Sequence, residues 1–189
     1  MPDTPALPPT LTTERLVLRA FTADDAPATQ EYVSSWELAS TTAAIPHPYP
    51  AGAAKAWIDT HPARHAGGEA VILAVTLRDS GELVGSIELR ISAGHRRGDL
   101  GYWTGPPHWG RGYATEAADA LVRWAFRELG LHRVFAAAFS RNPASSAVLR
   151  KVGMRHEGTL RSHVPRWGVL EDLEVYGILA EEMPAGEKS

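Results

Sequence analysis

The chain has 189 residues, of which 44% are hydrophobic and 22% are charged, as in one ordinary globular domain. It has no cysteine, which excludes disulfides, thiolate metal sites and a cysteine nucleophile. The net charge of −3 argues against a general nucleic-acid binder, and no run of about 18 apolar residues is present to span a membrane. We therefore expect a cytoplasmic protein with no membrane partner and no direct contact with nucleic acid.

Apolar periodicity, turn residues and helix caps predict the elements in chain order. A strand over residues 15–21 leads into a helix over 23–35, which Thr22 opens with Asp25 as its capping partner. Three prolines then stiffen a loop over residues 44–50. The remaining predicted elements are, in order, a helix over 51–60, strands over 71–77, 82–91 and 99–104, a helix over 115–129, a strand over 134–139, a helix over 143–152, and strands over 155–162 and 171–179.

This order predicts a single domain over residues 12–180, with disordered tails over residues 1–11 and 181–189. Strands interleaved with helices indicate an α/β (α+β) fold, in which a mixed central sheet of about six to seven strands carries helices on both faces. The clearest helix, over residues 115–129, has an apolar stripe on one side, so it is expected to pack on the sheet.

A glycine-containing turn, Trp109-Gly-Arg-Gly-Tyr-Ala114, joins the strand over 99–104 to this helix. Glycines let the backbone approach a ligand closely, and the free N–H groups of a helix start attract phosphate. The spacing is neither that of a dinucleotide-binding turn, since residue 115 is Thr, nor that of a P-loop. The turn therefore predicts a pyrophosphate site, with a purely structural tight turn as the alternative.

The charge is unevenly distributed along the chain. Between His132 and Arg166 there are seven Lys or Arg residues and a single acid, Glu157. Such a basic region suits a small polyanionic ligand, although a solvated basic face would have the same composition. The eight histidines show no His-Glu-x-x-His spacing, so no metal site is expected.

Several short motifs occur in a characteristic order around this turn. They are Thr13-Glu-Arg-Leu-Val-Leu-Arg19, Ile45-Pro-His-Pro-Tyr49, Leu100-Gly-Tyr-Trp-Thr-Gly105, Ala114-Thr-Glu-Ala117, Asn142-Pro-Ala-Ser145, Lys151-Val-Gly-Met154 and Glu171-Asp-Leu-Glu-Val-Tyr176. This ordered set resembles the GNAT superfamily of N-acetyltransferases, and most closely its RimJ/RimL branch, whose best-known members acetylate protein N-termini. The resemblance spans about residues 12–180.

The resemblance implies a GNAT fold with a splayed V between the fourth and fifth strands. Acetyl-CoA would enter this V as co-substrate, with its pantetheine arm on the fourth strand and its pyrophosphate on residues 110–115. Arg150 or Lys151 would reach its 3′-phosphate, with charge at a helix end favoured by the dipole as the alternative. The residues expected to bind acetyl-CoA are Tyr102, Trp103, Thr104, Trp109, Gly110, Arg111, Gly112, Tyr113, Ala114, Thr115, Asn142, Ser145 and Arg150.

The same resemblance assigns catalytic candidates. Ser145 would give a proton to the leaving thiolate and Asn142 would bond the ligand arm or simply cap its helix. Many relatives carry a Tyr donor where this chain has Leu149 and a Glu base where it has Ala138. Replacement bases are Asp99, Glu88, Asp172 and His163, with ordered water as the alternative to any of them.

Aromatic residues on loops are expected to form the acceptor pocket. Trp36, His47, Tyr49 and Trp167 would surround the acceptor, with Asp172 near its entry. We expect an acetyl-CoA-dependent N-acetyltransferase in which an amine attacks directly within a ternary complex. The acceptor would be a protein N-terminus, such as that of a ribosomal protein, a free amino acid or a small amine. The alternatives are a catalytically quiet acyl-CoA sensor and an ATP- or NAD-binding protein; a monomer and a homodimer are equally compatible with the sequence.

Overall fold

The computed structural model describes residues 8–183, so the predicted tails lie largely outside the described residues. Its strands are β1 (Leu11–Thr12), β2 (Leu16–Arg19), β3 (Ala70–Leu77), β4 (Leu83–Ser92), β5 (Arg97–Thr104), β6 (Arg133–Phe139), β7 (Arg155–Arg166) and β8 (Val169–Leu179). Its α-helices are α1 (Ala26–Ser34), α2 (Trp36–Ser40), α3 (Ala53–Asp59), α4 (His61–Ala66), α5 (Tyr113–Glu128) and α6 (Pro143–Lys151). Within these residues, no helix has the length and apolar character needed to cross a bilayer.

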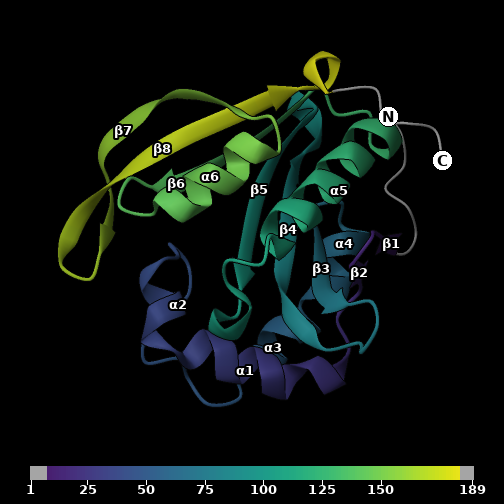
Figure 1. Cartoon of the computed structure of the whole chain (residues 1–189), viewed down its shortest axis with the longest axis vertical. Coiled ribbons are helices and arrows are strands. Elements are labelled where there is room, and N and C mark those ends of the chain that lie inside the picture. Colours follow the sequence, from purple (N-terminus) through teal and green to yellow (C-terminus); the bar gives the residue numbers. More distant parts are fainter. Residues whose placement is uncertain (1–7, 184–189) are drawn as a thin grey trace.

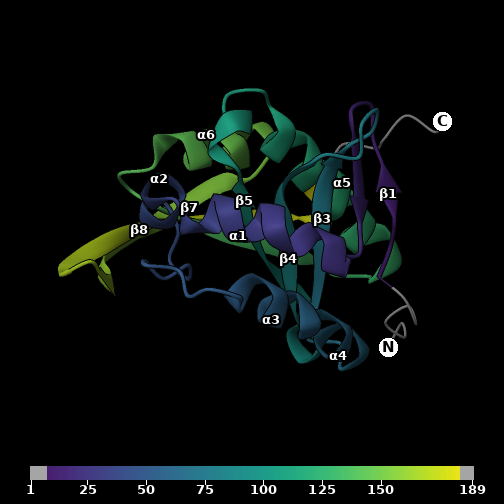
Figure 2. The same ribbon diagram turned by 90° about the horizontal axis from the view of Figure 1, so that it is seen from below.

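The strands form one mixed sheet in the order β1-β2-β3-β4-β5-β6-β8-β7 (Figure 1). Helices α5 and α6 lie on one face of the sheet, α3 and α4 lie on the other, and α1 crosses the lower end (Figures 1 and 2). The predicted mixed sheet with helices on both faces is therefore confirmed.

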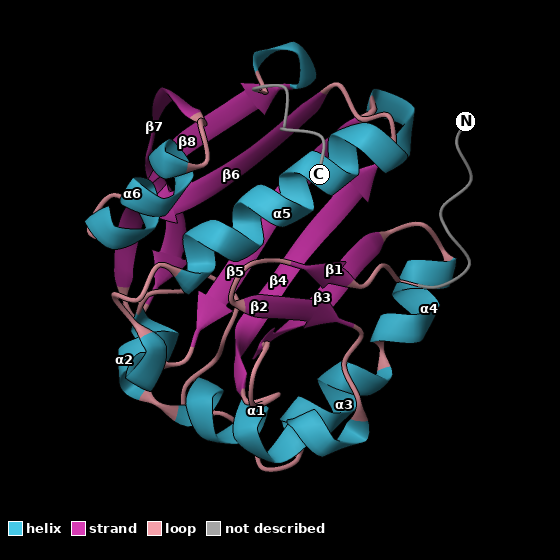
Figure 3. Ribbon diagram, turned by 45° about the vertical axis from the view of Figure 1, so that its right-hand side comes forward, coloured by secondary structure: helices cyan, strands magenta, loops and turns pink. Residues whose placement is uncertain are grey.

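Helix α5 lies along one face of the sheet and contributes its buried side chains to the hydrophobic core (Figure 3). Its stripe of Ala118, Leu121, Val122 and Ala125 is completely buried against the sheet. Burying each large aliphatic side chain contributes roughly 1.5–3 kcal/mol, so this stripe fixes the start of α5 relative to the strand ends. Gly130, with φ of 58°, follows the helix as the sequence predicts for a C-terminal cap.

Strands β5 and β6 separate along most of their length. They pair in parallel only at Arg97↔Arg133, Gly98↔Val134 and Asp99↔Phe135. From Leu100 to Thr104, β5 still pairs with β4 but has no β6 partner on its other edge, while β6 pairs with β8 throughout. This confirms the V between the predicted fourth and fifth strands.

The sheet has eight strands and not six to seven, because β1 is added at one edge. Two residues are too few to show an alternating pattern, and β1 begins at Leu11, inside the predicted tail. The last hairpin is longer than predicted on both sides of the Trp167-Gly168 turn. A bulge between Leu160 and Val164, where Ser162 has φ of 49°, interrupts the alternation there.

Helices α2 and α4 were not predicted from the sequence. Helix α2 has only five residues and follows α1 directly, because Ser35 leaves the helical conformation and caps α2 through the N–H of Leu38 at 3.2 Å. Helix α4 begins at His61-Pro62, where proline occupies the first turn that tolerates it.

Candidate active site

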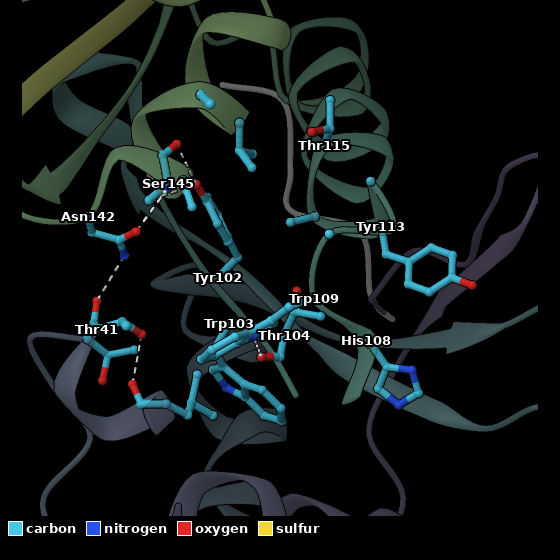
Figure 4. A pocket seen from close by; sticks show the side chains of 18 of the residues that line it. Thr41, Tyr102, Trp103, Thr104, His108, Trp109, Tyr113, Thr115, Asn142 and Ser145 are labelled. Atoms are coloured by element: carbon cyan, nitrogen blue, oxygen red, sulfur yellow. Dashed lines mark hydrogen bonds between the residues drawn. The ribbon is translucent and has the colours of Figure 1, made fainter. Parts of the chain in front are cut away.

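A cleft of about 400 Å³ opens where β5 and β6 separate. The end of β5, the loop before α5, the first turns of α5 and α6, and the end of α2 surround it (Figure 4). The residues that line it and were expected from the sequence are Tyr102, Trp103, Thr104, Trp109, Gly110, Gly112, Tyr113, Ala114, Thr115, Asn142 and Ser145.

Six successive main-chain amides lie at the start of α5, beside this cleft, without a protein partner. Within the described residues, the N–H groups from Gly110 to Thr115 donate no hydrogen bond, whereas that of Glu116 reaches Gly112 O at 3.1 Å and starts the helix. Gly110 and Gly112 have φ of 75° and 82°, which turn the chain so that these amides converge. Unpaired amides at the positive end of a helix dipole are an arrangement that could hold a diphosphate.

Contacts behind this loop hold it in place. The Glu116 carboxylate accepts hydrogen bonds from Thr13 Oγ1 at 2.6 Å and from Arg15 N at 2.9 Å. Arg15 also donates to the carboxylate through Nε at 2.7 Å and to Arg111 O through Nη1 at 2.9 Å. Burial alone would raise the pKa of Glu116, but these hydrogen bonds outweigh it and keep the pKa below its usual value. The acid of the first α5 turn is thus neutralised on the side away from the cleft.

Asn142 connects the two walls of the cleft. Its Oδ1 accepts from Ser145 N at 3.1 Å, so it caps α6 as predicted, and its Nδ2 donates to Thr41 O at 3.5 Å after α2. Ser145 Oγ lies 2.8 Å from the hydroxyl of Tyr102, which projects from β5 (Figure 4). Burial raises the pKa of Tyr102 to about 12, against a smaller opposing effect of the Ser145 hydrogen bond.

Two residues expected to bind the cofactor, Arg111 and Arg150, lie outside the cleft lining, and a third, Thr104, lines it with its carbonyl already bonded. Arg111 does not line the cleft, and its carbonyl is the acceptor for Arg15. Arg150 turns toward the sheet, where its Nη1 donates to Tyr176 Oη at 3.2 Å, and the next residue, Lys151, lines the cleft instead. Thr104 lines the cleft, but its carbonyl already accepts from the Trp109 indole at 2.6 Å.

The carboxylates considered as bases lie outside the cleft lining. Glu88 bonds Arg64 of α4 at 2.6 Å and Asp99 bonds Arg90 at 2.8 Å. Both carboxylates lie on the face of the sheet that α4 covers, and both are engaged in these ion pairs. Their role as bases stays a prediction, and the structure places both carboxylates in ion pairs outside the cleft lining.

Asp172 serves the last hairpin. Its Oδ1 accepts from Ser162 N at 2.6 Å and so holds the bulge in β7. It does not line the cleft. The fourth candidate, His163, is an exposed residue on β7, next to Ser162. Within residues 8–183, no three His, Cys, Asp or Glu side chains gather closely enough to hold a metal ion.

Three of the predicted acceptor residues meet beside α2. The ring centroid of Trp36 lies 4.9 Å from that of Trp167 and 5.3 Å from that of His47. Arg166 stacks over Trp167 at 4.1 Å and donates to the carbonyls of Thr42 and Ile45, which fastens the hairpin tip to the loop. Tyr49 is half-buried further along this loop, and burial raises its pKa.

Part of the cleft lining could not be predicted from any sequence pattern. Leu38, Thr41 and Thr42 line it from α2 and the residues after it, and this helix is too short for a periodic pattern. His108 also lines it, with Nε2 3.1 Å from Tyr32 Oη. Burial lowers the pKa of His108, with Glu82 opposing that effect.

Comparisons with known proteins agree with this geometry. A family model described as the acetyltransferase (GNAT) domain matches residues 15–155. The uncharacterised N-acetyltransferase YoaA of Bacillus subtilis (strain 168) is 33% identical over 172 residues, which cover 90% of this chain and 97% of YoaA. YdaF of the same organism, provisionally named a ribosomal N-acetyltransferase, is 36% identical over 109 residues, which cover 57% of this chain and 59% of YdaF. Mycobacterium smegmatis RimJ in complex with CoA-disulfide has the same fold, with a TM-score of 0.83 at 24% identity, covering 97% of this chain and 93% of RimJ.

The fold, the open V and the unpaired amides define an acyltransferase that uses acetyl-CoA as co-substrate. The chain belongs to the GNAT acetyltransferase family. Members of this family transfer the acetyl group to an amine, and the structural neighbours of the chain include RimJ and RimL.

Proposed function

We propose that this chain acetylates a primary amine by direct attack on acetyl-CoA in a ternary complex. The observation that carries the proposal is the row of six unpaired amides at the start of α5, beside an unpaired edge of β5. The amides would hold the diphosphate, and N–H groups on the free β5 edge would stabilise the oxyanion. Because the chain has no cysteine, we propose the reducing cytoplasm as its compartment.

In the reaction, the neutral amine attacks the thioester carbonyl, a C–N bond forms and the C–S bond breaks. The thiolate takes up one proton and the amine loses one. Within the described residues no carboxylate lines the cleft, so we propose that the amine is deprotonated through water. The acceptor we propose is a protein N-terminus, such as that of a ribosomal protein, or a small amine; the name of YdaF and the aromatic cluster of Trp36, His47 and Trp167 support it.

A second candidate, a quiet acyl-CoA sensor, is favoured by the absence of Glu88, Asp99 and Asp172 from the cleft. Two measurements separate the candidates. Thermal unfolding should show stabilisation by acetyl-CoA but not by ATP or NAD. A free-thiol assay with peptide N-termini, amino acids and small amines should then show acceptor-dependent release of CoA. Binding without thiol release from any acceptor would favour the sensor, and equal stabilisation by ATP would refute both candidates.

A further inference from the structure

The hydroxyl of Tyr102 reaches across the cleft from β5 to the first turn of α6. Its oxygen lies 2.8 Å from Ser145 Oγ and 3.2 Å from Ser145 O. Along β5, Leu100 is buried in the core with α5 and Tyr102 follows it on the same face, whereas Trp103 points the other way, toward Tyr32 of α1. The alternation of the strand therefore directs Tyr102 at α6.

The direction of the hydrogen bond between Tyr102 Oη and Ser145 Oγ determines whether the serine hydroxyl can point its own hydrogen into the cleft. The carbonyl of Ser145 lies in a helix, where it accepts from the N–H four residues later, so Oγ is the nearer and less committed acceptor for the phenol. If the phenol donates to Oγ, the serine hydrogen is left free to point into the cleft. Within the described residues, Tyr102 is the side chain that bonds Ser145 Oγ.

We propose that Tyr102 is a positioning residue, which holds Ser145 Oγ so that the serine hydrogen faces the sulfur of the departing CoA. This inference rests on the proposed function. When the C–S bond breaks, its electron pair goes to sulfur and Ser145 gives its hydroxyl proton to the thiolate. The proton that the amine loses passes through water to Ser145 and replaces it, so the serine is unchanged after each turnover.

Two further observations support this role. Burial raises the pKa of Tyr102 to about 12, so its phenol stays protonated and remains a hydrogen-bond donor at any working pH. The other tyrosine that lines the cleft, Tyr113, packs its ring under Arg15 at 5.0 Å and points away from Ser145 (Figure 4). Leu149, one helical turn beyond Ser145, is fully buried and has no proton to offer.

The test is a double-mutant cycle with Tyr102→Phe and Ser145→Ala, read out as kcat and KM from thiol release. Tyr102→Phe removes one oxygen and should lower kcat about tenfold, while KM for acetyl-CoA and for the acceptor stays within about twofold. In the Ser145→Ala background, Tyr102→Phe should have less than about a twofold effect, because its partner is already missing. Tyr176→Phe is the matched control: it also removes a buried phenol oxygen that bonds α6, through Arg150, but outside the cleft, so it should keep wild-type kcat.

Three results would overturn the inference. The first is a wild-type kcat for Tyr102→Phe, and the second is a double variant in which the two losses of kcat multiply. The third is a Tyr102→Phe variant that loses acetyl-CoA affinity and melting temperature together, which would show a merely structural role. The cycle also separates this inference from the proposed function. A wild-type protein that releases no thiol with any amine refutes both, whereas equal turnover of Tyr102→Phe and wild type refutes only the role of Tyr102.

Discussion

Gly112 occupies the last position before α5, in a backbone conformation that other residues rarely adopt. Its φ is 82°, and a Cβ there would lie 3.4 Å from Arg15 Nη2. In Gly112→Val, the β-branched side chain should force the turn to rearrange and misdirect the amides from Gly110 to Thr115. We expect acetyl-CoA to lose most of its stabilising effect on this variant in a thermal unfolding assay.

The chain offers a matched control for this strain. Gly52 also precedes a helix with a positive φ, 76°, and a Cβ there would meet nothing within 4 Å. Gly52→Val should lower the melting temperature of the free protein to a similar degree but keep the full acetyl-CoA shift. If Gly112→Val also kept the full shift, the loop before α5 would not be the diphosphate site.

Two adjacent basic residues of α6 should behave differently toward the cofactor. Lys151 lines the cleft, whereas the guanidinium of Arg150 is held on Tyr176. We expect Lys151→Ala to weaken acetyl-CoA binding roughly fivefold by losing a charge-assisted contact to the 3′-phosphate. Calorimetric titration with CoA and 3′-dephospho-CoA checks this: the two ligands should bind Lys151→Ala almost equally. A larger loss in Arg150→Ala than in Lys151→Ala would contradict the assignment.

At the scale of elements, the cleft depends on how α6 is attached to α2. Asn142 caps α6 and also reaches Thr41 O, so Asn142→Ala should cost about 1 kcal/mol and widen the cleft as well. Ser35→Ala removes the cap of α2 at about the same cost, but Ser35 itself does not line the cleft, and its hydroxyl bonds the main chain of Leu38 and not the side chain. Urea unfolding should give similar losses for the two variants, while acetyl-CoA affinity should fall only in Asn142→Ala. Equal affinities would show that the link to Thr41 has no effect on the cleft.

The elements that could be predicted from the sequence are those whose pattern repeats several times. Helix α5 shows its apolar stripe over four turns, and β3 and β4 show strand residues on either side of a clear turn. Helix α2 and strand β1 are too short to repeat any pattern, and α2 also supplies part of the cleft. The divergence of β5 from β6 came from the family resemblance, because pairing between strands leaves no local trace in either strand.

The parts of the site that lie in one continuous segment of the chain could be predicted from the sequence. The loop amides and the Asn142 cap each belong to a continuous run of residues, and the structure shows both. Contacts between distant residues were not predictable. Tyr102 and Ser145 are 43 positions apart. Glu88 was proposed as a base because it is polar within an apolar strand, and nothing near it in sequence reveals Arg64 as its partner.

Over the whole molecule, the basic region from His132 to Arg166 is largely used for internal contacts. Arg133 pairs with Glu157, Arg141 with Glu171 and Arg155 with Glu182. These pairs join β6, β7 and β8 and the segments after them, so three of the seven positive charges of this region are neutralised within this half of the sheet. The positive potential for the cofactor is therefore expected to come mainly from the loop amides and Lys151.

Acid stability of the whole molecule is expected to depend on His61, on the face of the sheet opposite α5. Its side chain is 8% exposed, and Trp57 packs edge-on against it at 4.3 Å. Burial, with a smaller effect from Arg64, lowers the pKa of His61 from 6.5 to about 4. Between these values the unfolded chain binds a proton that the folded protein does not, so the free energy of unfolding falls as the pH drops from 6.5 to 4. The complete loss from this one group would be about 3 kcal/mol.

His61→Phe should remove most of this pH dependence, because phenylalanine packs between Trp57 and Phe21 without a titrating group. A smaller slope should remain between pH 6.5 and 4, since burial also lowers the pKa of His108. Below pH 4, Asp25 and Glu116 have pKa values held under their usual range, so both proteins should lose stability together as these carboxylates are protonated. Urea unfolding at half-unit pH steps measures the difference. Curves for wild type and His61→Phe that run parallel from pH 6.5 to 4 would show that His61 is already solvated or bonded in the folded protein.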